Sequence, residues 1–147
     1  VYRQFITHFN GSYTRDSEYY RLLLKEIILD QKQLIVYRNQ AGVISGYLIV
    51  QRKKKEAYVE EAIYLESIAL MRMLKAAIGK EDEIIVEVSQ CEKLEKLFPL
   101  CIPKKQPYMM ARINHPALFS KLYNHKTNSI CEAFALSKKP LWIHEYY

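Results

Sequence analysis

The chain has 147 residues, 50% of them hydrophobic, and a formal net charge of +6 at pH 7. This length allows one ordinary core, or one domain of about 100 residues with an appendage. No apolar run approaches the roughly 18 residues of a membrane span, and no signal peptide is visible. The composition therefore argues against a membrane partner and favours a soluble, cytoplasmic protein.

Cysteine and histidine patterns indicate no metal site. The three cysteines, Cys91, Cys101 and Cys131, match no zinc spacing, so we expect buried, reduced thiols. The four histidines are scattered without metal-ligand spacing. A nucleophile and base formed by Cys131 with His125 or His144 is the alternative, but the sequence provides no activating context for that thiol.

The first half of the chain predicts a helix and three antiparallel strands. The chain starts at Val1 without a methionine, and residues 2–5 have the composition of structured interior, so we expect a piece of a longer protein. Asp16 is a good N-cap for a helix over 17–29, with an apolar face at 20, 23, 24, 27 and 28. Strands over 34–38 and 43–50 form a hairpin around the turn 39–42. Gly46 predicts a bulge or a close backbone approach within the second strand. A third strand, 57–64, follows the basic tip 52–55.

The second half predicts alternating helices and strands. A helix over 67–78 ends at Gly79, and a mostly apolar strand covers 83–88. Ser89 and Glu92 form a capping-box pattern for a short helix through Phe98. A strand over 108–113 and a helix starting at Pro116 complete the order. We therefore predict an α/β (α+β) fold with a mixed sheet flanked by helices, because a strand-helix-strand connection normally makes a parallel pair.

The connection from the third strand to its helix has the layout of a phosphate site without its glycines. A pyrophosphate is cradled by a glycine-bearing turn whose backbone N–H groups approach it at a helix N-terminus. Here Leu65, Glu66, Ser67 and Ile68 fill that turn, and Glu66 adds a negative charge. The sequence predicts that this segment does not bind such a group.

Four local runs resemble the GNAT acetyltransferase fold, and more closely the second GNAT-like domain of the two-domain enhanced-intracellular-survival (Eis-like) bacterial acetyltransferases. The runs are Arg15–Tyr20, Gly46–Ile49, Glu60–Leu65 and Tyr108–Ile113. Their order and spacing extend over about residues 13 to 123. The resemblance implies a degenerate GNAT-like domain over 1–123 and a C-terminal extension and docking tail over 124–147, in place of the family's sterol-carrier-like domain.

The resemblance also implies a division of the cofactor chemistry. In Eis-like enzymes the first GNAT domain binds acetyl-CoA and the second does not. Acetyl-CoA is therefore expected on a missing N-terminal GNAT domain, which becomes the main partner, and no cofactor is expected on this segment. The implied reaction is acetyl transfer from acetyl-CoA to a primary amine on a small molecule or a peptide. This segment alone is expected to be inactive and to shape the acceptor cleft.

The last residues, 139–147, resemble the Eis-like tail whose terminal carboxylate acts as the catalytic base. A carboxylate near the acceptor can remove the ammonium proton. By this resemblance Tyr147 is the candidate base, and Trp142 and Glu145 are candidate substrate-binding residues. The opposing interpretation is a frayed terminus. The apolar residues at 141–143 and 146–147 favour docking instead.

Three alternatives remain open from the sequence. The domain could be a non-catalytic interaction or assembly domain, including one that forms a homo-oligomer, since a duplicated fold can persist for packing alone. It could also be an autonomous acetyltransferase with an unusual phosphate loop. Nucleic-acid binding by the basic tip 52–55 is the third, but no nucleic-acid module pattern accompanies these charges, and we expect them to be solvated.

Overall fold

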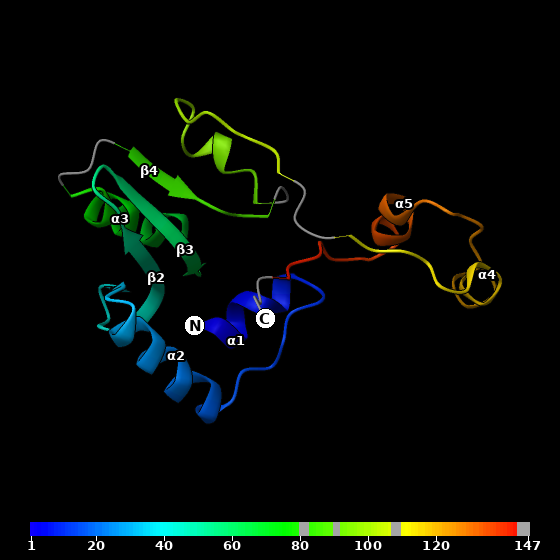
Figure 1. The fold of residues 1–147 in the computed structure, drawn as a ribbon, viewed down its shortest axis with the longest axis horizontal. Helices are drawn as coiled ribbons and strands as arrows, with labels where there is room; N and C mark the ends of the chain where they lie inside the picture. The colour runs from blue at the N-terminus through cyan, green and yellow to red at the C-terminus, as the bar shows by residue number, and fades with distance from the viewer. Residues whose placement is uncertain (80–82, 90–91, 107–109, 144–147) are drawn as a thin grey trace.

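A four-stranded sheet forms the centre of the protein (Figure 1). The computed structural model describes residues 1–79, 83–89, 92–106 and 110–143. The strands, in spatial order, are β1 (Gln33–Arg38), β2 (Ile44–Arg52), β3 (Glu56–Tyr64) and β4 (Glu83–Val86). The helices and helical turns are α1 (Tyr2–Phe5), η1 (Ile6–His8), α2 (Ser17–Leu29), α3 (Ser67–Ile78), η3 (Leu94–Lys96), α4 (Pro116–Tyr123) and α5 (Ile130–Ala135).

The sheet has the predicted mixed topology. Strands β1, β2 and β3 pair antiparallel, and β3 pairs parallel with β4 after the α3 crossover. In the hairpin turn, Gly42 has φ +75°, and the Asn39 side chain accepts hydrogen bonds from the Ala41 and Val43 amides. The α/β class with a mixed sheet flanked by helices is confirmed.

Gly46 fulfils both predictions made for it. The β1–β2 register shifts next to it, because Tyr37 pairs with Gly46 whereas Arg38 pairs with Ile44. A Cβ atom at Gly46 would lie 2.7 Å from the Met73 methyl carbon and 3.1 Å from the Ile63 carbonyl oxygen. The bulge and the absence of a side chain allow α3 to pack closely on β2.

A second register shift decides which side chains of β3 face which side of the sheet. Ile49 pairs with Glu61 and Val50 with Val59, so Glu60 is the extra residue of a bulge. Because side chains alternate along a strand, this extra residue reverses the alternation beyond it. Val59 and Ala62 therefore both join the core under α3, whereas Ile63 belongs to a second cluster with α1.

The main core lies between the sheet and α3. Helix α3 contacts all four strands, and its buried residues follow helical spacing. These residues are Ala69, Leu70, Met73, Leu74 and Ala77. The helix ends at Gly79, which has φ +51°, as the sequence predicts.

Helix α2 has the predicted bounds, but part of its apolar face is exposed. The Asp16 carboxylate caps it by accepting a hydrogen bond from the Tyr19 amide at 2.8 Å. Ile27 is buried, whereas Leu24 is 49% and Ile28 is 75% exposed. Helical periodicity predicted the helix correctly, but it does not determine which apolar residues find a packing partner.

The segment after β4 is less regular than predicted. Strand β4 ends at Val86 rather than Val88. Among the described residues, the short helix predicted through Phe98 is represented by the turn η3, and the Glu92 carboxylate accepts a hydrogen bond from the Ser89 amide. The strand expected over 108–113 is wrong for residues 110–113, which are irregular, and Met110 is fully exposed. A strand needs a neighbour with which to pair, and the described sheet ends at β4. Residues 108 and 109 of that prediction lie outside the described residues.

Helices α4 and α5 lie apart from the sheet (Figure 1). The His115 imidazole caps α4 by accepting from the Leu118 amide, and Asn124 ends the helix in the left-handed conformation. The Ser129 hydroxyl caps α5. We call residues 110–139 the α4–α5 lobe. The boundary at 123 between domain and extension remains a prediction.

The structure also tests the predictions made for the cysteines. Cys101 and Cys131 are free and exposed, so their predicted burial is wrong, because the segments that carry them lie outside the packed core. Cys91 is outside the described residues. Within the described ranges, none of the helices has the length and apolarity needed to cross a membrane. The same ranges hold no group of three His, Cys, Asp or Glu side chains suited to a metal ion.

Candidate functional site

The candidate site lies where β3 and β4 diverge. The two strands pair only from Glu56–Val59 on β3 to Glu83–Val86 on β4, and β3 continues to Tyr64. In open α/β sheets, ligands bind in the crevice outside the carboxyl ends of parallel strands. In this protein that position is the β3–α3 connection around Tyr64, Glu66 and Ser67.

The β3–α3 connection does not fit a pyrophosphate. No glycine lies between Tyr64 and α3, and Glu66 occupies the N-cap position with no side-chain capping bond. The Glu66 carbonyl already accepts from the Ala69 and Leu70 amides. Because a helix N-terminus attracts anions, a carboxylate next to it competes with a bound phosphate. That this turn holds no phosphate remains a prediction.

A second carboxylate lies at the same strand end. The Tyr64 hydroxyl donates to a Glu92 carboxylate oxygen at 2.6 Å, and the other oxygen accepts from the Ser89 amide at 3.1 Å. Burial and the charge of Glu92 raise the pKa of Tyr64 well above its usual range. The hydroxyl therefore stays protonated and holds the Glu92 carboxylate in place.

The face of β3 that points away from α3 carries a buried ion pair. Arg15 and Glu61 are 2% and 6% exposed, and two hydrogen bonds of 2.9 and 2.5 Å join their side chains. The Tyr47 hydroxyl donates to the same carboxylate at 2.7 Å. Burial alone would lower the pKa of Arg15, but the hydrogen bond and charge of Glu61 outweigh it and raise that pKa. For Tyr47, burial and the Glu61 charge raise the pKa.

Aromatic rings enclose the Arg15 guanidinium. Its central carbon lies 4.0 Å from the Tyr2 ring centroid and 4.7 Å from that of Tyr19. Cation–π contacts of this kind stabilise a desolvated cation. In the sequence, Arg15 and Glu61 stand out only as members of the runs that resemble the GNAT fold. The ion pair between their side chains was not predicted, because no local spacing connects residues so far apart.

Trp142 packs into an aromatic cluster over the end of β3. Its side chain is 6% exposed and joins Tyr2, Phe5 and Ile63 in one buried cluster. The rings of Phe5 and Trp142 meet edge to face, with centroids 5.5 Å apart. The ring of Phe5 also packs near the ring of Tyr64, with centroids 5.7 Å apart. The tail therefore reaches the same strand end as the candidate site.

Backbone pairing fixes the tail before Trp142. The Asn10 amide donates to the Pro140 carbonyl at 2.8 Å, and the Trp142 amide donates to the Asn10 carbonyl at 2.9 Å. Gly11 has φ +83°, and a Cβ atom there would lie 2.8 Å from a Leu141 methyl carbon. These contacts hold residues 140–142 against the N-terminal segment, while the docking of the whole tail 124–147 remains a prediction.

The predicted site residues are only partly covered by the structure. Trp142 lies in the buried aromatic cluster, and its role in substrate binding remains a prediction. Glu145 and Tyr147 lie outside the described residues, so the candidate base has no described position.

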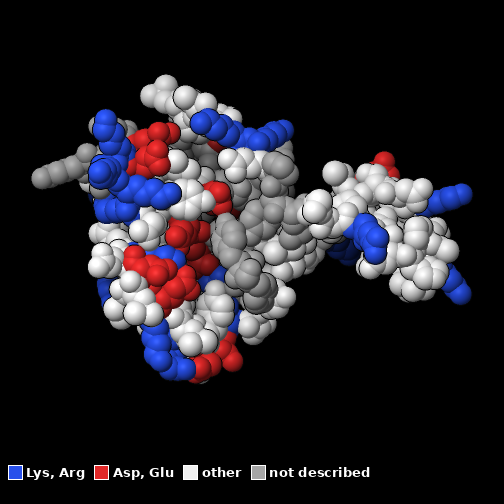
Figure 2. Space-filling model, viewed as in Figure 1, with Lys and Arg blue, Asp and Glu red and all other residues white. Residues whose placement is uncertain are grey.

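A network around Lys32 fixes the start of β1 against the β3 bulge. The Lys32 ammonium lies 2.7 Å from a Glu26 oxygen, 3.2 Å from Asp30 and 2.9 Å from Glu60. Burial lowers its pKa, but the three carboxylates outweigh this effect and raise it. Figure 2 shows acidic side chains gathered near the end of α2, where this network lies. The basic tip at 53–55 is exposed, as expected for solvated charges.

Comparisons with known proteins show a similarity of fold. No family model matches the chain, and no curated protein matches it. A Trypanosoma brucei acetyltransferase is 15% identical with a TM-score of 0.49, covering 75% of this chain and 90% of its own. AAC(6')-Iy bound to a CoA bisubstrate analogue gives 11% identity, a TM-score of 0.47, and 74% and 86% coverage. Glucosamine-6-phosphate N-acetyltransferase of Arabidopsis thaliana is 11% identical with a TM-score of 0.45, and the match covers 76% of this chain and 88% of that one. These structures are acetyltransferases of the GNAT type, and similarity at this level assigns no activity to the chain.

Proposed function

We propose that this chain is the C-terminal, non-CoA-binding half of a GNAT N-acetyltransferase that transfers an acetyl group from acetyl-CoA to a primary amine. In this proposal an N-terminal GNAT domain holds acetyl-CoA. The present domain forms part of the acceptor cleft and delivers the carboxylate of Tyr147 to it. The arrangement corresponds to the two-domain Eis-like enzymes that the sequence resembles.

The observation that carries the proposal is the docking of the tail at the end of β3. Trp142 packs there against Phe5 and Ile63, beside the strand end that lacks a phosphate turn. A tail with no role beyond the last helix would not need a buried tryptophan and two backbone hydrogen bonds to hold it. Fixing the chain at 140–142 limits where a terminal carboxylate five residues later can act.

The chemistry assigned to this half is proton removal. A primary amine is mostly protonated near neutral pH, and it must lose a proton before it can attack an acetyl thioester. A carboxylate near the acceptor nitrogen attracts the ammonium form and then accepts its proton. The acetyl group itself comes from acetyl-CoA on the other domain.

Calorimetry with acetyl-CoA tests the missing cofactor site. Titrating acetyl-CoA into this chain should give no binding heat, because Glu66 opposes a phosphate at the start of α3. An acetyltransferase with an intact phosphate loop, measured under the same conditions, is the positive control. Micromolar binding by the chain would contradict the proposal and favour an autonomous acetyltransferase.

Tail variants of the full two-domain protein test the carboxylate. Deleting Tyr146 and Tyr147 should lower kcat by about 10²- to 10⁴-fold, the usual contribution of a general base. Tyr147→Phe retains a terminal carboxylate and should keep most of the activity. The same deletion made in the 147-residue chain, where Trp142 is the only tryptophan, reports by fluorescence whether the truncated tail stays docked. Unchanged turnover after the deletion rejects the base role.

The second candidate, an interaction or assembly domain, is favoured by the outer surface of α2. Leu24, Ile28 and Leu29 are 49%, 75% and 79% exposed, more apolar surface than a solvated helix needs. Sedimentation equilibrium of the chain and of Ile28→Asp distinguishes the two functions. Self-association abolished by Ile28→Asp, together with full activity of the tail deletion, would favour assembly.

A further inference from the structure

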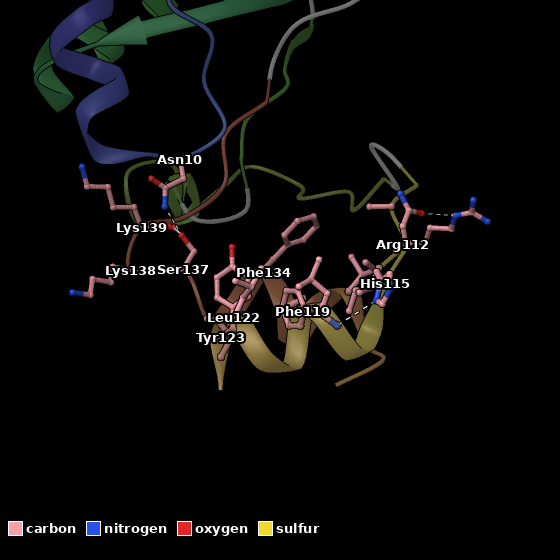
Figure 3. A pocket seen from close by; sticks show the side chains of 17 residues that line it. Asn10, Arg112, His115, Phe119, Leu122, Tyr123, Phe134, Ser137, Lys138 and Lys139 are labelled. Atoms are coloured by element: carbon pink, nitrogen blue, oxygen red, sulfur yellow. Dashed lines mark hydrogen bonds between the residues drawn. The ribbon is translucent and has the colours of Figure 1, made fainter. Parts of the chain in front are cut away.

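A groove crosses the α4–α5 lobe, away from the β3 strand end (Figure 3). Its volume is about 870 Å³, and it lies between the two helices, residues 111–115 and the returning segment 136–139. Its lining includes these large apolar side chains: Leu118, Phe119, Leu122, Tyr123, Phe134 and Leu136.

The groove has a pre-formed apolar floor. Leu118 and Leu122, one helical turn apart on α4, are 49% and 70% exposed, and Phe134 on α5 is 42% exposed. The rings of Phe119 and Tyr123 stack with centroids 4.6 Å apart, which limits their movement. An apolar side chain inserted here would remove large exposed surfaces from water without first rearranging the wall.

The surroundings of the groove are strongly basic. The lobe carries Arg112, Lys121, Lys126, Lys138 and Lys139. Glu132 is the only acidic residue in 110–139, and its carboxylate accepts a hydrogen bond from the Thr127 hydroxyl. Figure 2 shows the blue side chains of this lobe distributed around white surface. On this face the basic side chains are spread over the lobe and are not gathered at one point.

The cations stand at opposite ends of the groove. In Figure 3, Arg112 lies at one end and Lys138 and Lys139 lie at the other, with their charged groups directed outward from the apolar floor. A ligand with a single anionic head would need cations at one end only. Two basic ends separated by an apolar floor instead match a chain with acidic residues on both sides of an apolar stretch.

We propose that this groove is a docking site for an acidic amphipathic peptide segment of a partner protein. Apolar side chains of the segment fill the floor between α4 and α5, in the manner of helix-in-groove recognition. Acidic residues before and after them pair with Arg112 and Lys138. This function is separate from acetyl transfer and does not depend on the β3 strand end.

The test uses a pair of synthetic labelled peptides and the whole chain. One peptide has a leucine-rich core flanked on both sides by glutamates, and the other has lysines in place of the glutamates. Fluorescence anisotropy should show that the acidic peptide binds at least about tenfold more tightly, equivalent to about 1.4 kcal/mol, and that added salt weakens it. Equal binding of the two peptides overturns the proposal.

Two variants locate the interaction, and a third controls for them. Leu122→Glu and Lys138→Glu should each weaken binding of the acidic peptide by about tenfold or more, since one places a charge on the floor and the other reverses a charge at one end. Both side chains are exposed, so the fold is retained. Val43→Glu, at a residue 59% exposed next to the β1–β2 turn, should leave binding unchanged. Unaltered binding by Leu122→Glu overturns the proposal, as does binding to phosphatidylglycerol vesicles but to neither peptide.

Discussion

Both carboxylate oxygens of Glu61 are hydrogen-bonded to the Arg15 guanidinium inside the protein. Removing one partner of a buried ion pair leaves the other charge without compensation, which costs about 3–5 kcal/mol. Glu61→Ala should therefore lower the free energy of unfolding by about this amount, because Arg15 is 2% exposed and cannot reach water. Urea unfolding followed by circular dichroism measures the change.

Two comparisons separate this effect from a general loss of charge. Glu18→Ala breaks an exposed pair with Arg21 and should change stability little. Arg15→Met combined with Glu61→Leu removes both charges together and should cost less than Glu61→Ala, because no unpaired charge remains. If Glu61→Ala were as mild as Glu18→Ala, the buried pair would not contribute to the fold.

At the scale of elements, Gly11 controls the docking of the tail. It has φ +83°, and a Cβ atom there would lie 2.8 Å from a Leu141 methyl carbon. Gly11→Ala should therefore displace residues 140–142, expose Trp142, and shift its fluorescence to longer wavelength with greater acrylamide quenching. The backbone strain alone should cost about 1–2 kcal/mol.

Gly42→Ala is the matched control for that experiment. Gly42 also has a positive φ, +75°, but nothing lies within 4 Å of the position a Cβ atom would take. It should lose similar stability while the Trp142 emission stays unchanged, because the turn is far from the tail. Equal fluorescence of the two variants would mean that the tail does not depend on close approach at Gly11.

Local patterns predicted the elements from α2 to β4 because each is determined by short-range chemistry. Asp16 capped α2, Gly42 allowed the hairpin turn, and Gly79 ended α3, as expected. The same reasoning failed for 110–113, where suitable residues have no neighbouring strand. A pattern can indicate that a segment is able to form a strand, but the partner comes from the whole fold.

The candidate site was predictable only where its chemistry is local. The missing glycines and Glu66 lie within one turn of α3, so the prediction that this turn holds no phosphate can be made from the sequence alone. The Arg15–Glu61 pair and the Tyr64–Glu92 bond join distant residues and carry no periodic signal. The bulge at Glu60, which turns Glu61 toward Arg15, likewise depends on pairing with β2.

For the molecule as a whole, tyrosine hydroxyls beside carboxylates make stability sensitive to alkaline pH. Burial and a hydrogen bond to Glu87 raise the pKa of Tyr58 to about 12. The pKa values of Tyr47 and Tyr64 are also raised, by burial and by the charges of Glu61 and Glu92. The usual tyrosine pKa in an unfolded chain is about 10. All three hydroxyls therefore bind their protons more tightly in the folded state.

This difference determines the direction of the pH dependence. Below about pH 10 the hydroxyls are protonated in both states, and their contribution to stability is fully present. As the pH rises further, the unfolded chain loses its protons first, so the free energy of unfolding should fall, most visibly between about pH 10 and 12. Urea unfolding at a series of pH values measures this fall.

Tyr64→Phe should make the alkaline fall shallower. Near neutral pH the variant loses the hydrogen bond to Glu92 and should be less stable than the parent by about 0.5–1.5 kcal/mol. Above about pH 10 the unfolded parent releases the Tyr64 proton while the folded parent retains it, and this difference lowers the parent's free energy of unfolding. Phenylalanine has no such proton, so the variant does not lose stability in this way. The deficit of the variant should therefore shrink as the pH rises. A deficit that stayed constant from about pH 8 to 11 would show that Tyr64 titrates alike in the folded and unfolded states.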